Sequence, residues 1–290
     1  MIGWLLAAHA DAFQVAAAAF RFLLYATALF TGGLALFLAL FGARLRPEDR
    51  AAFGRGVRLA AALGLGAVAL WFASQVTLAE GDWPMDAELW WMLAGLPPGW
   101  SAGVAAAGFA ALAVAGGGAG VAGVAGLALL LVSFALVGHT AAHPARALLA
   151  PTLVLHLVAA AFWAGSLWPL TRVARGRPRD AAPLIAAWTR WAAWLVAALA
   201  VSGAALAWAI VGSVAALVGT RYGWALLGKV ALVGVLLAFA AWHRFRLTPA
   251  LERDEPGAGA RLAASIRAEA AVMTGVVWMV SEMTATSPTE

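Results

Sequence analysis

Eight apolar segments separated by short polar loops constrain this chain more than any other feature of its sequence. Each is close to the length of about 20 residues that an α-helix needs to cross a bilayer. The segments cover residues 13–41, 57–79, 100–115, 121–139, 147–170, 184–211, 222–245 and 262–283. Only 11% of the residues are charged, against about 25% in soluble domains. We therefore predict an all-α polytopic membrane helix bundle of about eight transmembrane helices, folded as a single domain over residues 1–290.

The distribution of arginines predicts the orientation of the bundle. Arginines gather in the loops after the first, fifth and seventh segments, whereas the opposite loops hold two arginines and several carboxylates. The basic loops contain Arg44, Arg46, Arg50, Arg55, Arg58, Arg172, Arg175, Arg177, Arg179, Arg244, Arg246, Arg253 and Arg261. Cytoplasmic loops carry the excess of basic residues, so we predict a cytoplasmic (inner) membrane protein with both termini on the outer side. These arginines form no single patch, which makes nucleic-acid binding a poor interpretation.

Four of the five histidines gather at the predicted outer face. His139 ends the fourth segment, His156 lies in the outer half of the fifth, and His9 precedes the first. His143 follows His139 by four residues, and Pro144 disfavours a helical backbone for it. Ionisable groups at membrane depth are costly and mark functional sites, and imidazole is the commonest metal ligand. From spacing alone, the cluster is an outer metal or proton site.

Two methionines at the same predicted face bear on the choice of ion. Met279 and Met283 are four residues apart, so they share one face of the last helix. Thioethers favour Cu(I), and imidazole suits both copper oxidation states. The chain has no cysteine, which excludes thiolate sites and disulfides. A His/Met collection of this kind is what an outer copper site needs, although ordinary packing is the other interpretation of the methionines.

Three charged residues lie well inside the predicted segments, where charge is costly. Arg21 and Lys229 have three open interpretations: they repel cations, bind an anionic group or pair with polar side chains. Glu269 is the one carboxylate well inside a segment. It is either a cation or proton acceptor on the cytoplasmic side or the partner of an arginine.

Several motifs in the second half of the chain resemble those of the copper resistance protein D family. They are SFALVGHTAA at 133–142, LHLVAAAFWAGSLWPL at 155–170, SGAALAW at 202–208, RYGWALLGKV at 221–230 and SIRAEAA at 265–271. The resemblance covers the last five segments well and the first three weakly. It implies an eight-helix inner-membrane protein that moves copper towards the cytoplasm beside a small periplasmic copper-binding protein. It also implies that His139 and His156 are copper ligands.

Residues and resemblance together predict copper transport or uptake across the cytoplasmic membrane, in copper homeostasis or resistance, with no enzymatic activity. The expected partners are a copper ion, as Cu(I) or Cu(II), the periplasmic protein and the lipid bilayer. The predicted metal ligands are His139, His156, His143, His9, Met279 and Met283. The alternative is a membrane electron-transfer protein that binds haem b between paired histidines. A metal-dependent membrane enzyme ranks last, because only Asp11 and Glu282 offer loosely placed carboxylates.

Overall fold

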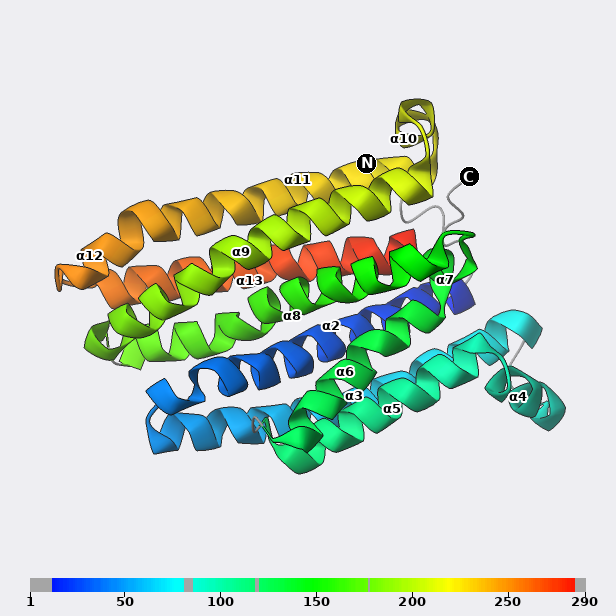
Figure 1. Cartoon of the computed structure of the whole chain (residues 1–290), viewed down its shortest axis with the longest axis horizontal. Coiled ribbons are helices and arrows are strands. Elements are labelled where there is room, and N and C mark those ends of the chain that lie inside the picture. Colours follow the sequence, from blue (N-terminus) through cyan, green and yellow to red (C-terminus); the bar gives the residue numbers. More distant parts are fainter. Residues whose placement is uncertain (1–11, 81–85, 118–119, 177, 285–290) are drawn as a thin grey trace.

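The protein is a bundle of long helices that run side by side (Figure 1). The computed structural model describes residues 12–80, 86–117, 120–176 and 178–284. In these ranges the regular secondary structure is entirely helical, without a strand. Seven of the described helices are long and apolar enough to cross a membrane, and an eighth apolar segment, Val121–Leu136, is shorter. The predicted all-α polytopic membrane bundle is thereby confirmed.

The long helices cover most of the predicted segments and extend beyond them at their starts. They are α2 (Ala12–Phe41), α3 (Pro47–Glu80), α5 (Pro97–Ala115), α8 (Arg146–Gly176), α9 (Pro178–Val211), α11 (Arg221–Trp242) and α13 (Ala258–Met283). Between them lie η1 (Gly42–Arg44), α4 (Ala87–Ala94), α6 (Val121–Ser133), η2 (Phe134–Leu136), α7 (Gly138–Ala142), α10 (Val214–Gly219), η3 (His243–Leu247) and α12 (Thr248–Glu252). Helix α3 starts in the polar loop because Pro47 suits a first helical turn and Glu48 and Asp49 complement its dipole there.

The fourth predicted segment, 121–139, is divided rather than continuous. Helix α6 ends at Ser133 and passes into the 3-10 turn η2. Val137 then adopts an extended backbone, and Gly138 takes the left-handed φ of 80°. Glycine reaches that region without steric cost. The chain thus turns just before His139 and begins the short helix α7 there.

The two ends of the bundle differ in charge. Figure 1 shows the α2–α3, α8–α9 and α12–α13 connections at one end, which we call the arginine end. The short helices α4, α7 and α10 lie at the other, which we call the histidine end. At the arginine end, Arg172 of α8 donates to the buried Asp49 carboxylate of α3 at 3.1 Å. The loops predicted to share one membrane face therefore do lie at one end of the bundle.

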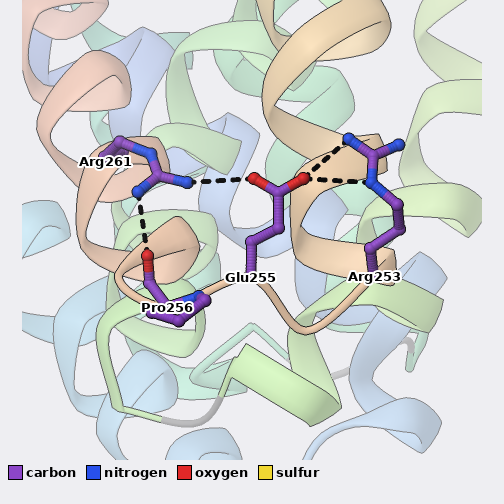
Figure 2. Close-up of polar contacts among 4 residues, drawn as sticks. All are labelled: Arg253, Glu255, Pro256 and Arg261. Atoms are coloured by element: carbon purple, nitrogen blue, oxygen red, sulfur yellow. Dashed lines mark hydrogen bonds and ion pairs between the residues drawn. The ribbon is translucent and has the colours of Figure 1, made fainter.

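The connection between α12 and α13 is a compact arginine turn (Figure 2). Glu255 accepts from Arg253 at 2.8 and 3.0 Å and from Arg261 at 3.4 Å. Arg261 also donates to the Pro256 carbonyl oxygen at 2.9 Å. One carboxylate therefore holds two of the basic residues that predicted this end to be cytoplasmic.

Helix α2 is the centre of the packing and contacts α3, α8 and α13. It meets α8 where Gly33 faces Gly165. A Cβ atom at Gly33 would lie 1.8 Å from the Ala161 carbonyl oxygen, and one at Gly165 would lie 2.1 Å from the Gly33 carbonyl carbon. Small residues let membrane helices approach this closely. The position of α8 therefore depends on glycine, which has no side chain, at both position 33 and position 165.

At the histidine end, side chains of α2 hold the last turn of α13. The buried Arg21 guanidinium donates to the Ser281 carbonyl oxygen at 3.2 Å. The Tyr25 hydroxyl donates to Thr284 Oγ1 at 3.3 Å. Cations and donors near a helix C-terminus satisfy its unpaired carbonyls. Arg21 is thus a structural link between α2 and α13, which accounts for a charge inside this segment.

Candidate functional site

His139 lies in the first turn of α7 with its ring against α11. Its imidazole meets the Tyr222 ring edge-on, with centroids 5.6 Å apart and planes 85° apart. Its Nε2 is buried and has no hydrogen-bond partner among the described residues. Buried polar atoms are nearly always hydrogen-bonded, so an orphaned imidazole nitrogen at this position is available to a ligand.

His143 lies outside α7, as Pro144 predicts. The helix ends at Ala142, and the His143 backbone is extended, with φ −76° and ψ 141°. Its Nδ1 accepts a hydrogen bond from the Ala145 backbone N–H at 3.0 Å. One of its two ring nitrogens is therefore committed to the turn that leads into α8.

His156 lies on α8, and its ring faces α9. Its Nδ1 is 3.2 Å from Ser202 Oγ, and Gly203 leaves room for the ring. The Ser202 hydroxyl donates its hydrogen to the Ala198 carbonyl oxygen at 2.5 Å. With that hydrogen committed, Ser202 Oγ is placed to accept from Nδ1–H of His156, the tautomer in which Nε2 keeps its lone pair. Metal-binding histidines are commonly held in this way, with the second ring nitrogen donating to a neighbouring oxygen.

The predicted methionine ligands lie next to Tyr222. Met283 is buried in a small apolar cluster with Tyr222, Ala225 and Leu226. Met279 packs on the same cluster, and its methyl group would lie 3.0 Å from a Cβ at Gly228. Tyr222 thus contacts the His139 ring and also belongs to the apolar cluster of the methionines.

These residues surround one end of the bundle without forming a closed metal cage. Among the described residues there is no group of three or more His, Asp or Glu side chains that could hold a metal ion. His9 lies outside the described residues. Lys229 of α11 interacts electrostatically with His156, so a cation at that ring would experience repulsion. The ligand roles of His139, His143, His156, His9, Met279 and Met283 remain predictions.

A second polar cluster lies towards the arginine end, on three helical elements. Glu269 of α13 is buried, and its Oε1 accepts from Trp163 Nε1 of α8 at 2.6 Å. Its Oε2 lies 3.5 Å from His243 Nδ1. The other nitrogen of His243, Nε2, lies 2.8 Å from Ser265 Oγ. In the described part of the chain Glu269 thus lies beside a histidine. From the sequence alone, an arginine was one possible partner.

His243 begins a short π-helical segment that follows α11. Residues His243–Leu247 form a π-helix in which the Thr248 backbone N–H donates to the His243 carbonyl oxygen. A π-helical turn shifts the side chains that follow α11, and such turns are frequent at functional sites. Sequence reasoning missed this pair, because the only signals were a lone carboxylate and a lone histidine in different segments.

The second cluster borders a cavity of about 280 Å³ lined mainly by α8, α9, α11, η3 and α13. Its walls are mainly apolar, and its polar groups include Thr189, His243, Arg244 and Glu269. Trp188 also lines the cavity, and its buried Nε1 has no hydrogen-bond partner among the described residues. Ala159, three residues after His156, lines the cavity, whereas neither His139 nor His156 lines it. The histidine pair of the haem alternative is therefore outside this cavity.

Family comparisons match both halves of the chain. A model described as "Copper resistance protein D-like, N-terminal domain" matches residues 10–149. A model described as "Copper resistance protein D" matches residues 182–282. No curated protein and no solved structure gives a significant match. The second match contains Ser202, Tyr222, His243 and Glu269, and the first contains His139.

Proposed function

The chain belongs to the copper resistance protein D family, and we propose that it carries copper across the cytoplasmic membrane from the histidine end. It is a multi-pass membrane protein. In this proposal the arginine end faces the cytoplasm, because basic loops stay on that side. The histidine end and both termini then face outward. Copper arrives there from a small periplasmic copper-binding protein.

The observation that carries the proposal is the arrangement of His156. Its Nδ1–H is directed to Ser202 Oγ, so the lone pair of Nε2 is available to copper. The unpaired Nε2 of His139 supplies a second imidazole at the same end. Imidazole binds both Cu(I) and Cu(II), so these two side chains suit copper in either oxidation state.

The other predicted ligands supplement this pair. His143 retains Nε2 for a metal, because only Nδ1 is committed to the Ala145 N–H. Met279 and Met283 lie beside Tyr222, whose ring touches His139, and their thioethers would favour Cu(I). His9 would add a further imidazole. We propose that copper passes among these groups rather than residing in one rigid cage.

The test is copper binding by purified protein combined with copper accumulation in cells that express it. Alanine variants of His139, His143 and His156, singly and together, are compared with Thr152→Ala, a change on the same helix one turn before His156. We expect the triple variant to lose most binding and accumulation, and Thr152→Ala to behave like the unchanged protein. Retention of both activities by the triple variant would falsify the proposal.

The same preparation distinguishes the haem alternative. A haem b protein shows a Soret absorption band as purified, whereas a copper carrier without haem does not. We expect no such band. A band that disappears in His139→Ala and His156→Ala would replace the copper proposal with the electron-transfer one.

A further inference from the structure

The Glu269–His243 pair has one position left for a proton. Trp163 N–H occupies Oε1 of the carboxylate, and Ser265 Oγ lies beside Nε2 of the imidazole. The remaining atoms, Oε2 and Nδ1, face each other at 3.5 Å. In the tautomer in which Nε2–H donates to Ser265 Oγ, Nδ1 keeps its lone pair, and one further proton can be held on Oε2 or on Nδ1.

The charge of the pair depends on that one proton. With it, the pair is neutral overall, as a carboxylic acid beside imidazole or as a carboxylate beside imidazolium. Without it, a buried negative charge remains, and burial of an uncompensated charge is expensive. Among the described residues that line the cavity, Arg244 is the only other ionisable side chain. Trp163 from α8 and Thr189 and Trp188 from α9 are polar but uncharged. Arg244 is exposed, and its guanidinium lies over the Phe245 ring, so a further cation that enters the cavity beside the carboxylate would favour release of the proton.

The pair lies on the route that copper would take from the histidine end. His156 and Trp163 are seven residues apart on α8, so they share a helix face and lie about 10 Å apart along its axis. The cavity is lined by residues of α8 from Ala159 to Leu170, with Trp163 among them, and Glu269 of α13 lines it too. Its volume of about 280 Å³ accommodates several water molecules, each of which occupies about 30 Å³ in the liquid.

A metal ligand role suits the pair less well than proton binding. It offers one imidazole nitrogen and one carboxylate oxygen, and no third His, Asp or Glu among the described residues joins them. Carboxylate is a hard ligand that suits copper less than imidazole or thioether does. A proton needs only the two facing atoms.

Building on the proposed copper transport, we propose that Glu269 and His243 form a proton-exchange site that releases its proton when copper enters the cavity. The O–H bond at Oε2, or the N–H bond at Nδ1, breaks. Its electron pair stays on the pair of side chains, and the proton leaves through water in the cavity. One Cu(I) ion replaces one proton, so charge is balanced and no electron is transferred. When copper leaves, the pair takes up a proton again.

The test uses the full chain in sealed proteoliposomes, with Cu(I) kept reduced by ascorbate and a pH-sensitive dye inside. Copper uptake and proton movement are measured together, with and without an imposed pH gradient. We expect the unchanged protein to move about one proton per copper ion. Glu269→Gln and His243→Gln should lower the protons moved per copper at least fivefold and abolish the response to the gradient. The control is Glu252→Gln, which alters an exposed carboxylate on α12.

The outcomes separate this inference from the proposed function. Copper uptake without proton movement in the unchanged protein leaves transport intact and overturns the exchange site. The exchange site is also overturned if Glu269→Gln keeps its proton-to-copper ratio, or if it lowers the number of copper ions bound per purified protein, which would make Glu269 a copper ligand. If the unchanged protein takes up no copper, the proposed function fails and the exchange site fails with it. Unfolding temperatures in detergent identify any variant that has lost its fold. If one of Glu269→Gln and His243→Gln is unfolded, the proton-to-copper ratio of the other tests the exchange site.

Discussion

The contact between α2 and α8 predicts a large effect of adding one methyl group. In Gly165→Ala, the new Cβ would lie 2.1 Å from the Gly33 carbonyl carbon. Carbon atoms without a bond between them rest about 3.5 Å apart. The two helices must therefore separate by about 1.4 Å, the difference between these distances, or α8 must rotate.

General packing energetics set limits on the free energy that is lost when the two helices separate. A gap of 0.5–1 Å already forfeits a quarter to a half of each contact energy, and Leu34 and Phe162 are fully buried beside this contact. Overpacking of a well-packed core costs about 3 kcal/mol at the upper end of its usual range. Replacing a helical glycine with alanine stabilises the helix by about 1 kcal/mol. We expect a net loss of about 2 kcal/mol, which corresponds to about 4–8 °C in unfolding temperature.

The assay is thermal unfolding of the purified protein in detergent, followed by tryptophan fluorescence. The matched control is Gly66→Ala in α3, where a Cβ would meet nothing within 4 Å. That change should leave the unfolding temperature unchanged or raise it slightly. If Gly165→Ala and Gly66→Ala unfold at the same temperature, close glycine packing does not position α8 and the reasoning is wrong.

Three further changes probe single contacts. Ser202→Ala removes the acceptor of His156 Nδ1–H, and loss of such a second-sphere partner weakens metal binding by about 10- to 100-fold; an unchanged dissociation constant for Cu(I) contradicts the proposed tautomer. Lys229→Met removes the charge that acts on His156, so copper should bind about tenfold more tightly, and weaker binding would show that Lys229 assists the site. Arg21→Met deletes the hydrogen bond to the Ser281 carbonyl oxygen; loss of a charged hydrogen bond costs about 1.5–3 kcal/mol, so the unfolding temperature should fall by several degrees, and no fall would mean that α13 is held by other contacts.

The positions of the membrane helices were predictable because the length of each apolar segment can be read directly from the sequence. The predicted ends at Phe41, Ala115, Val211 and Met283 coincide with helix ends in the structure. The starts were less predictable, since polar residues also form helix. Helix α3 begins ten residues before the apolar run at Val57, because loop residues continue its hydrogen bonding.

The division of the fourth segment was not predictable from hydropathy. Residues 121–138 are apolar apart from Ser133, and apolar content does not separate an α-helix from the 3-10 turn and extended residue that follow Ser133. Gly138 offered the only local signal. Its positive φ becomes visible only in the structure, and it decides where the His139 ring points.

The candidate site was predictable as a list of residue types and not as an arrangement. His156 and Ser202 are 46 residues apart in sequence, and Trp163 and Glu269 are 106 apart. Neither contact follows from helical periodicity, because each joins two different helices. Pro144 was informative because it acts on its immediate neighbour.

Helix α8 carries residues of both polar clusters, and this has a consequence for the proposed transport. His156 belongs to the cluster at the histidine end, and Trp163, seven residues later, holds Glu269 of the second cluster. Both therefore move with α8, whose position against α2 depends on Gly33 and Gly165. A shift of α8 along its axis would alter the His156–Ser202 contact and the Trp163–Glu269 contact at once. The proposed coupling between copper uptake at one end and proton release near the other therefore needs no separate moving part beyond this one helix.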